Sequence, residues 1–286
     1  MPRFVGRYTP RTGVEFDAVR ISTFGSRQRL TMSKRWLAAL PVYNEAPYVN
    51  QVLDEVLKYA PVVLAVNDGS QDATGELLDQ RGDIAVLHHE KNRGYGAALK
   101  TAFQYAIDEG FEILVTLDCD GQHQPKRIPR FVSACQNADI VSGSRYLKKY
   151  EGDSVPPAQR LLINKQVTKS INDLFHWNLT DTFCGFKAYR TSALAQLQIT
   201  VEGYAMPLEL WAQAAMLEMH IIEIPVPLIY LDESRSFGGS LDDGSVRLAY
   251  YNQVIEQSVQ AMLDRGYKLP SSSSPTTSMQ RCGECP

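Results

Sequence analysis

Short apolar segments alternate with longer amphipathic ones through the first half of the chain, and this alternation limits the fold more than any other feature of the sequence. The short segments have the length of strands and cover residues 36–42, 62–66, 84–88, 113–117 and 140–142. The longer segments have the apolar spacing of helices and cover residues 47–57, 70–80, 96–109 and 125–135. Strands that alternate with helices of this length form parallel sheets with helices on both faces. The sequence therefore predicts an α/β fold with a mostly parallel central sheet.

Composition excludes several classes of protein. The chain has 286 residues, of which 44% are hydrophobic and 21% charged, as in an ordinary globular protein. The 29 basic and 32 acidic residues give a net charge of −3, so no overall positive field would attract nucleic acid, and no nucleic-acid partner is expected. No apolar run approaches the roughly 20 residues of a membrane span, so an integral membrane protein is not expected. Scattered cysteines and the lack of a secretory leader favour a reduced, cytoplasmic location.

The two ends of the chain differ in composition from its centre. Residues 1–35 carry eight basic and two acidic side chains and no lasting periodicity, which predicts a basic, poorly ordered arm. Residues 269–286 form a Ser-rich polar tail that is expected to be disordered. Within this tail, Cys282 and Cys285 lack the second pair of ligands that a zinc site needs. Residues 36–268 are therefore expected to form a single domain.

Polar side chains follow each of the five expected strands. The segments are Pro41-Val-Tyr-Asn-Glu45, Asn67-Asp-Gly-Ser-Gln-Asp72, Lys91-Asn-Arg-Gly-Tyr-Gly96, Asp118-Cys-Asp-Gly-Gln-His123 and Gly143-Ser-Arg-Tyr146. Any one of them could be an ordinary turn, because Asp, Asn, Gly and Ser are the usual turn residues. Ligands bind at the carboxyl ends of the strands in parallel sheets, so the five segments together indicate a binding site at that edge.

Asp118 and Asp120 are the most specific feature of that edge. Residues two apart on an extended chain point to the same side, so both carboxylates would face one ligand. Two such acids repel each other unless a cation or a shared proton lies between them, and Gln122 would add a neutral oxygen if the chain stays extended. Oxygen ligands of this kind suit Mg²⁺ or Mn²⁺, which take further ligands from waters and substrate phosphates. We therefore expect a divalent metal site here, with a solvated turn as the alternative.

Other nucleotide-binding and hydrolase motifs do not occur in the sequence. Gly94 and Gly96 are followed by Leu99 where a dinucleotide fingerprint has its third glycine, and no phosphate-binding Gly-Lys-Ser/Thr loop is found. There is no Gly-x-Ser-x-Gly elbow either. The two glycines are expected to let the start of a helix pack closely near the ligand. His123 is expected as an exposed neighbour of the metal site rather than as a ligand.

Taken in order, these segments resemble those of the inverting family 2 glycosyltransferases of GT-A fold, in particular dolichyl-phosphate mannose synthases and related polyprenyl-phosphate glycosyltransferases. The resemblance covers about residues 36–245 and includes, beyond the strand ends, Arg160, Asn164, the segment from Asp181 to Arg190, Glu209, Arg235 and Gly238. It implies a GT-A fold. It also implies metal-dependent, inverting transfer of mannose or glucose from a GDP- or UDP-linked donor to a polyprenyl or dolichyl-type phosphate.

The resemblance also implies roles for individual residues. The donor nucleotide sugar and the acceptor phosphate are expected to be bound by Pro41, Tyr43, Glu45, Asp68, Lys91, Asp118 and Asn164. Mg²⁺ or Mn²⁺ is expected at Asp118, Asp120 and Gln122. The transfer itself is expected to depend on Asp120, Arg145, Arg160 and Arg235. In such a site the metal offsets charge on the departing diphosphate, and guanidinium groups orient phosphate oxygens.

The acceptor could instead be a hydroxyl group on a soluble molecule or a saccharide. A lipid phosphate is already an anion, whereas a hydroxyl acceptor would need a general base, for which Asp181 is the candidate. Asp181 could equally cap the turn that follows it. Asp242 and Asp243 stand where the family has a basic residue, which favours the hydroxyl acceptor. A further alternative is a catalytically silent nucleotide-sugar-binding subunit of a membrane complex.

Contact with a membrane is expected to be peripheral. Without a span, the protein would dock at the cytoplasmic face, bind a small membrane partner subunit, or use a soluble acceptor. The basic arm is one place where membrane contact could reside. The other is an expected helix at 246–263, whose apolar stripe is predicted to face the core or a partner and consists of Leu248, Tyr251, Ile255, Val259 and Met262.

Overall fold

A ten-stranded sheet forms the centre of the structure, a computed structural model that describes residues 4–8, 19–23, 36–231, 238–270 and 280–281. The strands of its main part are β3 (Trp36–Val42), β4 (Val63–Asn67), β5 (Ala85–His88), β6 (Ile113–Thr116), β7 (Ile140–Ser144), β8 (Lys187–Arg190) and β9 (Ile221–Pro225). Strands β5, β4, β3 and β6 lie side by side and run parallel, as do β7 and β9. The predicted α/β fold with a mostly parallel sheet is confirmed.

One strand in the middle of the sheet runs against its neighbours. β8 pairs antiparallel with β6 on one side and with β7 on the other. Its first residue, Lys187, is level with Thr116 near the end of β6 and with Ser142 in β7. The loop that leads into β8 therefore lies beside the carboxyl ends of both neighbouring strands.

Three short strands extend the sheet at its two edges. β1 (Phe4–Tyr8) pairs with β2 (Val19–Thr23), and β2 pairs antiparallel with β5. At the other edge, β10 (Gln280–Arg281) runs parallel to β9. The sequence predicted no regular element in either terminal region, because strand pairing at an open sheet edge does not depend on a local apolar pattern. The division of the chain at residues 35 and 268 stays a prediction.

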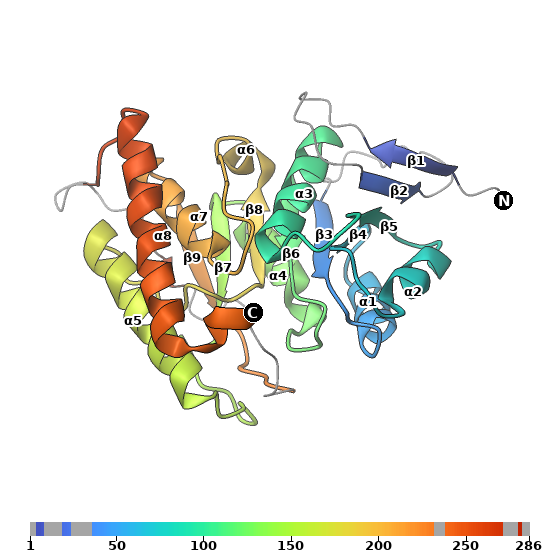
Figure 1. Cartoon of the computed structure of the whole chain (residues 1–286), viewed down its shortest axis with the longest axis horizontal. Helices are drawn as coiled ribbons and strands as arrows, with labels where there is room; N and C mark the ends of the chain where they lie inside the picture. Colours follow the sequence, from blue (N-terminus) through green and yellow to red (C-terminus); the bar gives the residue numbers. More distant parts are fainter. Residues whose placement is uncertain (1–3, 9–18, 24–35, 232–237, 271–279, 282–286) are drawn as a thin grey trace.

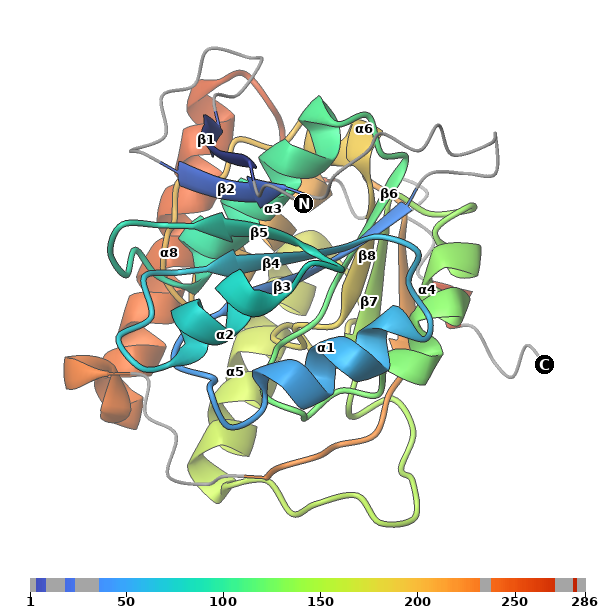
Figure 2. The ribbon, with the colours of Figure 1, turned by 90° about the vertical axis from the view of Figure 1, so that its right-hand side faces the viewer.

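Helices cover both faces of the sheet, and each face has its own apolar core. α1 (Val49–Leu57), α2 (Thr74–Gln80), η1 (Pro125–Arg127) and α4 (Ile128–Ala134) cover one face, which is turned toward the viewer in Figure 2. The other face is covered by α3 (Tyr95–Asp108), α5 (Ala158–Phe175), α6 (Thr191–Leu194), α7 (Met206–Met216) and α8 (Gly244–Asp264), the last preceded by η2 (Gly239–Asp242). Successive residues of β3 point into different cores. Leu37 packs in the core under α3, α5, α6, α7 and α8, and Ala38 packs in the core under α1, α2 and α4.

The helices differ from the sequence prediction mainly at their starts. The helix expected at 70–80 begins at Thr74, because the carboxylate of Asp72 accepts hydrogen bonds from the backbone of Thr74 (2.9 Å) and Ala46 (3.2 Å) and so holds the preceding residues in a loop. The apolar stripe of α8 is confirmed as a core face, where Tyr251 and Ile255 are buried. Among the helices within the described ranges, none is both long and apolar enough to cross a membrane.

Removing a core side chain is expected to destabilise the protein strongly. Leu64 lies on β4 and is fully buried. Leu64→Ala should lower the free energy of unfolding by about 2–5 kcal/mol, because it removes buried apolar surface and leaves a cavity. Guanidinium denaturation measures the change, with Asn50→Ala on the exposed face of α1 as the control. A loss below about 1 kcal/mol for Leu64→Ala would contradict the packing described.

Candidate active site

Two loops at the carboxyl edge of the sheet are joined by hydrogen bonds. After β3, the backbone N–H of Asn44 donates to Ser70 Oγ (2.9 Å), and that of Glu45 donates to Thr74 Oγ1 (2.8 Å). Ser70 lies in the loop that follows β4, and Thr74 is the first residue of α2 after that loop. Since these loops carry predicted donor-binding residues, the structure brings those residues to one place.

The predicted donor-binding residues at this edge differ in their exposure. Tyr43 and Lys91 are exposed, Pro41 is half-buried within β3, and Glu45 is buried. Exposed aromatic and cationic side chains are the kinds that contact nucleotides. Their roles in binding the donor stay predictions.

Asp68 is buried beneath the loop that follows β5. Its carboxylate accepts hydrogen bonds from the backbone N–H groups of Arg93 (3.0 Å) and Gly94 (2.7 Å), and it pairs with His89 Nδ1 at 2.6 Å. His89 Nε2 lies 2.8 Å from Thr101 Oγ1 on α3. Asp68 therefore holds the loop after β5 against α3, and its predicted contact with the nucleoside stays a prediction.

Asp118, which follows β6, is held by two neighbouring side chains. The hydroxyl of Tyr95 donates to Oδ1 (3.0 Å), and Nε2 of His123 lies 3.1 Å from Oδ2. Burial would raise the pKa of Asp118, but the hydrogen bonds with His123 and Tyr95 and the positive charge of Lys187 outweigh it, so the pKa lies below its ordinary value. Asp118 is therefore ionised at neutral pH. His123 is nearly buried, not exposed as the sequence suggested.

Gly185 lets the backbone approach Asp118 closely. A Cβ atom at this position would lie 2.3 Å from Asp118 Oδ2, well inside any allowed contact. The expected close packing of Gly96 is also confirmed, because a Cβ there would lie 2.5 Å from the carbonyl oxygen of Val201. Both glycines are needed for backbone spacing around the site.

The chain bends directly after Asp118 rather than staying extended. β6 ends at Thr116, the backbone N–H of Gln122 donates to Asp120 Oδ1 (2.9 Å), and Gly121 has φ +76°. The extended-chain reason for aligning Gln122 with the two carboxylates therefore does not apply, and its role as a ligand stays a prediction. Among the side chains that the structure describes, no three His, Cys, Asp or Glu residues converge on a metal position.

Arg145, which follows β7, forms a two-pronged ion pair with Asp181. Its Nε and Nη2 atoms donate to the two carboxylate oxygens at 2.6 and 2.9 Å. Burial disfavours both charges, but each group stabilises the other, so the pKa of Arg145 is raised and that of Asp181 is lowered. Asn164 on α5 donates to Asp181 Oδ1 (2.9 Å) and accepts from Thr168 (3.0 Å). Asp181 thus positions a guanidinium and an amide at the same edge.

Glu223 on β9 binds the turn that carries Asp181. Its carboxylate accepts hydrogen bonds from the backbone N–H groups of Thr180 (3.0 Å) and Asp181 (3.2 Å) and from the Thr180 hydroxyl (2.9 Å). Burial raises the pKa of Glu223 to about 7, although the bonds with Thr180 oppose the rise. The turn that carries Asp181 therefore rests on a buried carboxyl group that titrates near neutral pH.

The other two predicted arginines are Arg160 and Arg235. Arg160 is half-buried on the first turn of α5, one helical turn before Asn164. Arg235 lies outside the described residues.

Lys187 at the start of β8 is a buried amine that the sequence did not single out as a site residue. Its Nζ donates to the carbonyl oxygen of Cys184 and lies 5.4 Å from the ring centre of Trp211. Burial lowers its pKa. Tyr95 and Glu223 were also missed as partners of predicted site residues, because their contacts join segments far apart in sequence. His123 lies next to the predicted metal site, as expected.

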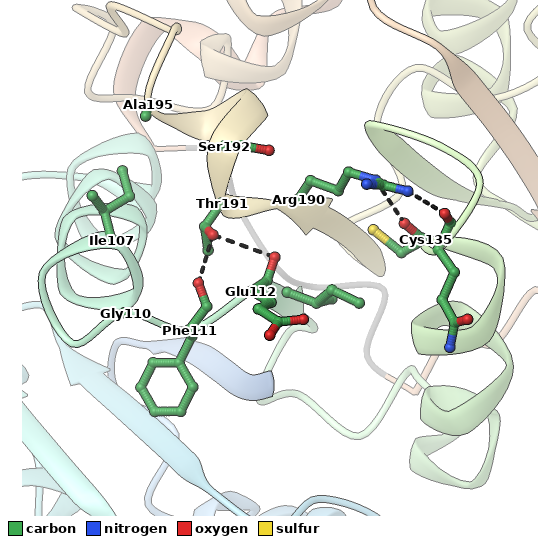
Figure 3. Close-up of a pocket in the computed structure, with 11 residues that line it drawn as sticks. Ile107, Gly110, Phe111, Glu112, Cys135, Arg190, Thr191, Ser192 and Ala195 are labelled. Atoms are coloured by element: carbon green, nitrogen blue, oxygen red, sulfur yellow. Dashed lines mark hydrogen bonds between the residues drawn. The ribbon is translucent and has the colours of Figure 1, made fainter. Parts of the chain in front are cut away.

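A cavity of about 450 Å³ lies at the opposite edge of the sheet (Figure 3). It is lined by the end of α3, the start of β6 and the end of β8. Arg190 donates to the carbonyl oxygens of Cys135 (3.1 Å) and Ala138 (2.9 Å), and Thr191 donates to that of Phe111 (2.5 Å). None of the predicted site residues lines it, and these polar groups serve the protein's own backbone.

Replacing Glu223 by Gln is expected to change how stability depends on pH. The pKa of Glu223 in the folded protein, about 7, lies above its ordinary value of 4.5. The protonated carboxyl therefore contributes stability that is complete below pH 4.5 and is lost as the pH rises through about 7. Between pH 4.5 and 8, the unfolding free energy of the wild type should fall by about 3 kcal/mol relative to that of Glu223→Gln. Urea denaturation over this range measures it; parallel curves would contradict the prediction.

Two known bacterial proteins are similar to this chain over most of its length. The chain is 31% identical over 226 residues to undecaprenyl-phosphate mannosyltransferase from Micrococcus luteus, a match that covers 75% of this chain and 92% of that protein. It is 30% identical over 247 residues to polyprenol monophosphomannose synthase from Mycolicibacterium smegmatis, covering 82% and 90%.

A solved structure shares the fold. Glucosyl-3-phosphoglycerate synthase from Mycobacterium tuberculosis, solved with Mn²⁺, UDP and glucosyl-3-phosphoglycerate, superposes with a TM-score of 0.58 at 16% identity, over 84% of this chain and 82% of that one. The predicted GT-A fold is confirmed. Residues 38–198 match the family described as "Glycosyl transferase family 2". The chain therefore belongs to glycosyl transferase family 2 and is a glycosyltransferase.

Proposed function

We propose that this enzyme transfers a hexose, mannose or glucose, from a GDP- or UDP-linked donor to a polyprenyl phosphate, with inversion and with Mg²⁺ or Mn²⁺. The observation that carries the proposal is the meeting of opposite charges at one sheet edge. The segment leading into β8 contacts both groups: Gly185 lies against the carboxylate of Asp118, which follows β6, and Asp181 binds the guanidinium of Arg145, which follows β7. The names of the two bacterial relatives refer to polyprenyl lipids and mannose, which supports this acceptor and this sugar.

The residues after β6 fit a divalent cation that shares its ligands with a substrate. Asp118 and Asp120 offer carboxylate oxygens, and each Asp118 oxygen that accepts one hydrogen bond keeps a lone pair for a metal. Mg²⁺ and Mn²⁺ suit such a site, because they take their other ligands from waters and phosphates. When bound, the metal would neutralise charge on the departing diphosphate.

The positive groups on the other side suit an acceptor phosphate. Asp181 fixes the plane of the Arg145 guanidinium, so its charge is already oriented before a substrate binds. An acceptor phosphate oxygen would attack the anomeric carbon from the face opposite the diphosphate. One C–O bond forms as the other breaks, and the nucleoside diphosphate leaves with the electron pair, which inverts the configuration. Such an oxyanion needs no general base.

Two observations weigh against the hydroxyl acceptor. Asp181, the candidate base, is fully buried and accepts hydrogen bonds from Arg145 and Asn164, so it is not placed to receive a proton from a substrate. Asp243 caps α8: its carboxylate accepts from the backbone N–H groups of Ser245 (2.8 Å) and Val246 (3.0 Å). The acidic pair that favoured a hydroxyl acceptor thus contains a helix cap.

Four exposed apolar side chains lie on the segments that follow β7 and β9 and at the starts of α5 and α8. We call Val155, Leu162, Leu231 and Val246 the apolar rim; their exposed fractions are 84%, 55%, 55% and 45%. Leu231 lies against Gly121, next to Asp120, since a Cβ on Gly121 would be 3.1 Å from Leu231 Cδ1.

The segments that carry the apolar rim adjoin one another. The backbone of Ser154 donates to Leu228 (2.8 Å), and the start of α8 meets the start of α5 through Gly244 and Gln159. Figures 1 and 2 both place the start of α5 and the loop before it at the lower end of the molecule. Clustered apolar side chains on a surface mark interaction sites. We propose that the apolar rim docks on the membrane that holds the lipid acceptor.

Replacing Asp120 by Asn is expected to lower turnover at least about 100-fold, because it removes a charge from the proposed metal site. The enzyme is incubated with Mn²⁺, labelled GDP-mannose or UDP-glucose, and polyprenyl phosphate, and label that enters an organic extract is counted. Asp264→Asn, at the far end of α8, makes the same chemical change and should leave the rate unaltered.

Each outcome of this assay has a definite meaning. Label in the organic phase supports the lipid phosphate acceptor, and donor consumption with saccharide acceptors alone would support the hydroxyl acceptor. Unchanged turnover in Asp120→Asn would overturn the metal assignment.

Leu162→Glu is expected to weaken membrane binding at least about tenfold, because a charged side chain replaces an apolar one on the apolar rim. Sedimentation with phospholipid vesicles measures it. Leu269→Glu makes the same change at an exposed position outside the apolar rim and serves as the control. Equal sedimentation of both variants would contradict docking through the apolar rim.

A further inference from the structure

A short loop before α7 is fixed against the start of α3. The carbonyl oxygen of Glu202 accepts a hydrogen bond from the backbone N–H of Ala97 (3.0 Å), and its carboxylate pairs with Arg93 Nη2 (2.8 Å). Glu209 on α7 accepts from the backbone N–H of Val201 (2.8 Å). The loop is thus held at its start by groups on two helices and on the segment before α3.

Tyr204 projects from this loop toward the site and remains 42% exposed. Its ring stacks on that of Tyr95, with ring centres 5.9 Å apart and an angle of 18° between the planes. Tyr95 in turn donates its hydroxyl to Asp118. The exposed ring of Tyr204 is therefore separated from the diphosphate side of the proposed site by one tyrosine side chain.

Direct contacts link Tyr204 to both sides of the proposed site. Tyr95, on which Tyr204 stacks, donates to Asp118, and Asp118 lies against Gly185 in the segment that leads into β8. The same segment carries Asp181, which binds Arg145. The exposed ring of Tyr204 therefore lies beside the carboxylate at which the proposed donor diphosphate would bind.

In an inverting transfer, the hexose lies between the departing diphosphate and the attacking acceptor. A pyranose ring has one face of C–H groups, which is attracted to the negative face of an aromatic ring. We propose that Tyr204 binds the hexose of the donor by stacking against it. This inference rests on the proposed function, because that function assigns the donor diphosphate, to which the hexose is bonded, to the carboxylate beside which Tyr204 stands.

The exposure of the ring supports a ligand contact over a structural one. The loop is held by the backbone and carboxylate of Glu202 and by Glu209, none of which involves the Tyr204 ring. Removing the ring should therefore leave the loop and the protein folded, and the free energy of unfolding of Tyr204→Ala should stay within about 1 kcal/mol of the wild type.

The test compares the affinity for a nucleotide sugar with that for the matching nucleoside diphosphate. Wild type, Tyr204→Ala and Tyr204→Phe are titrated calorimetrically in Mn²⁺ with GDP-mannose and GDP, and with UDP-glucose and UDP. Tyr204→Ala should lose about fivefold in affinity for the nucleotide sugar and keep its affinity for the diphosphate. Tyr204→Phe keeps the ring and should restore the wild-type ratio. Tyr267→Ala, beyond the end of α8, is the matched control.

The outcomes separate this inference from the proposed function. An equal loss of affinity for both ligands in Tyr204→Ala would mean a structural role and overturn the stacking. Unchanged affinity for the nucleotide sugar would overturn it as well, and the proposed function would stand in either case. A wild type that binds neither nucleotide sugar would overturn the proposed function and this inference with it.

Discussion

The short segment from Asp181 to Lys187 holds both halves of the site, because it leads into a strand that runs against its neighbours. β8 lies between β6 and β7, so its approach passes the carboxyl ends of both. Asp181 binds Arg145 on one side, and Gly185 lies against Asp118 on the other. The separation between the carboxylate and guanidinium sides is thereby set by a few residues of backbone, whose position depends on the pairing of three strands.

Buried charges in this region are stable only as a group. Asp181 has no exposure, and its ionised form depends on Arg145 and on hydrogen bonds from Asn164. Glu223 beneath them and Lys187 beside them are also buried. Removing one partner of a buried ion pair leaves an uncompensated charge, which costs more than the pair contributes. The arrangement therefore favours fixed orientation of the charged groups over stability, which is what the proposed phosphate site would require.

Much of the first half of the fold could be predicted, because its signals are local. β3 has the predicted bounds, and α1 and α3 begin within two residues of theirs. No element was predicted between residues 143 and 245. α7 is buried on every side and so lacks the polar face that marks a surface helix, and the place of β8 depends on distant strands. The polar strand ends were recognisable for the same local reason. Their partners were not: Tyr95 for Asp118 and Glu223 for the turn at Asp181 come from other parts of the chain.

The glycines around the site have a consequence for how sequence variation in this protein is interpreted. Gly96 and Gly185 carry no chemistry, yet any side chain at either position would collide with backbone or with a carboxylate. A mutational scan would find these positions as intolerant as those of charged residues. Loss of activity there would report on the spacing between backbones, and conserved glycines in related chains would mark where two loops touch rather than where a substrate binds.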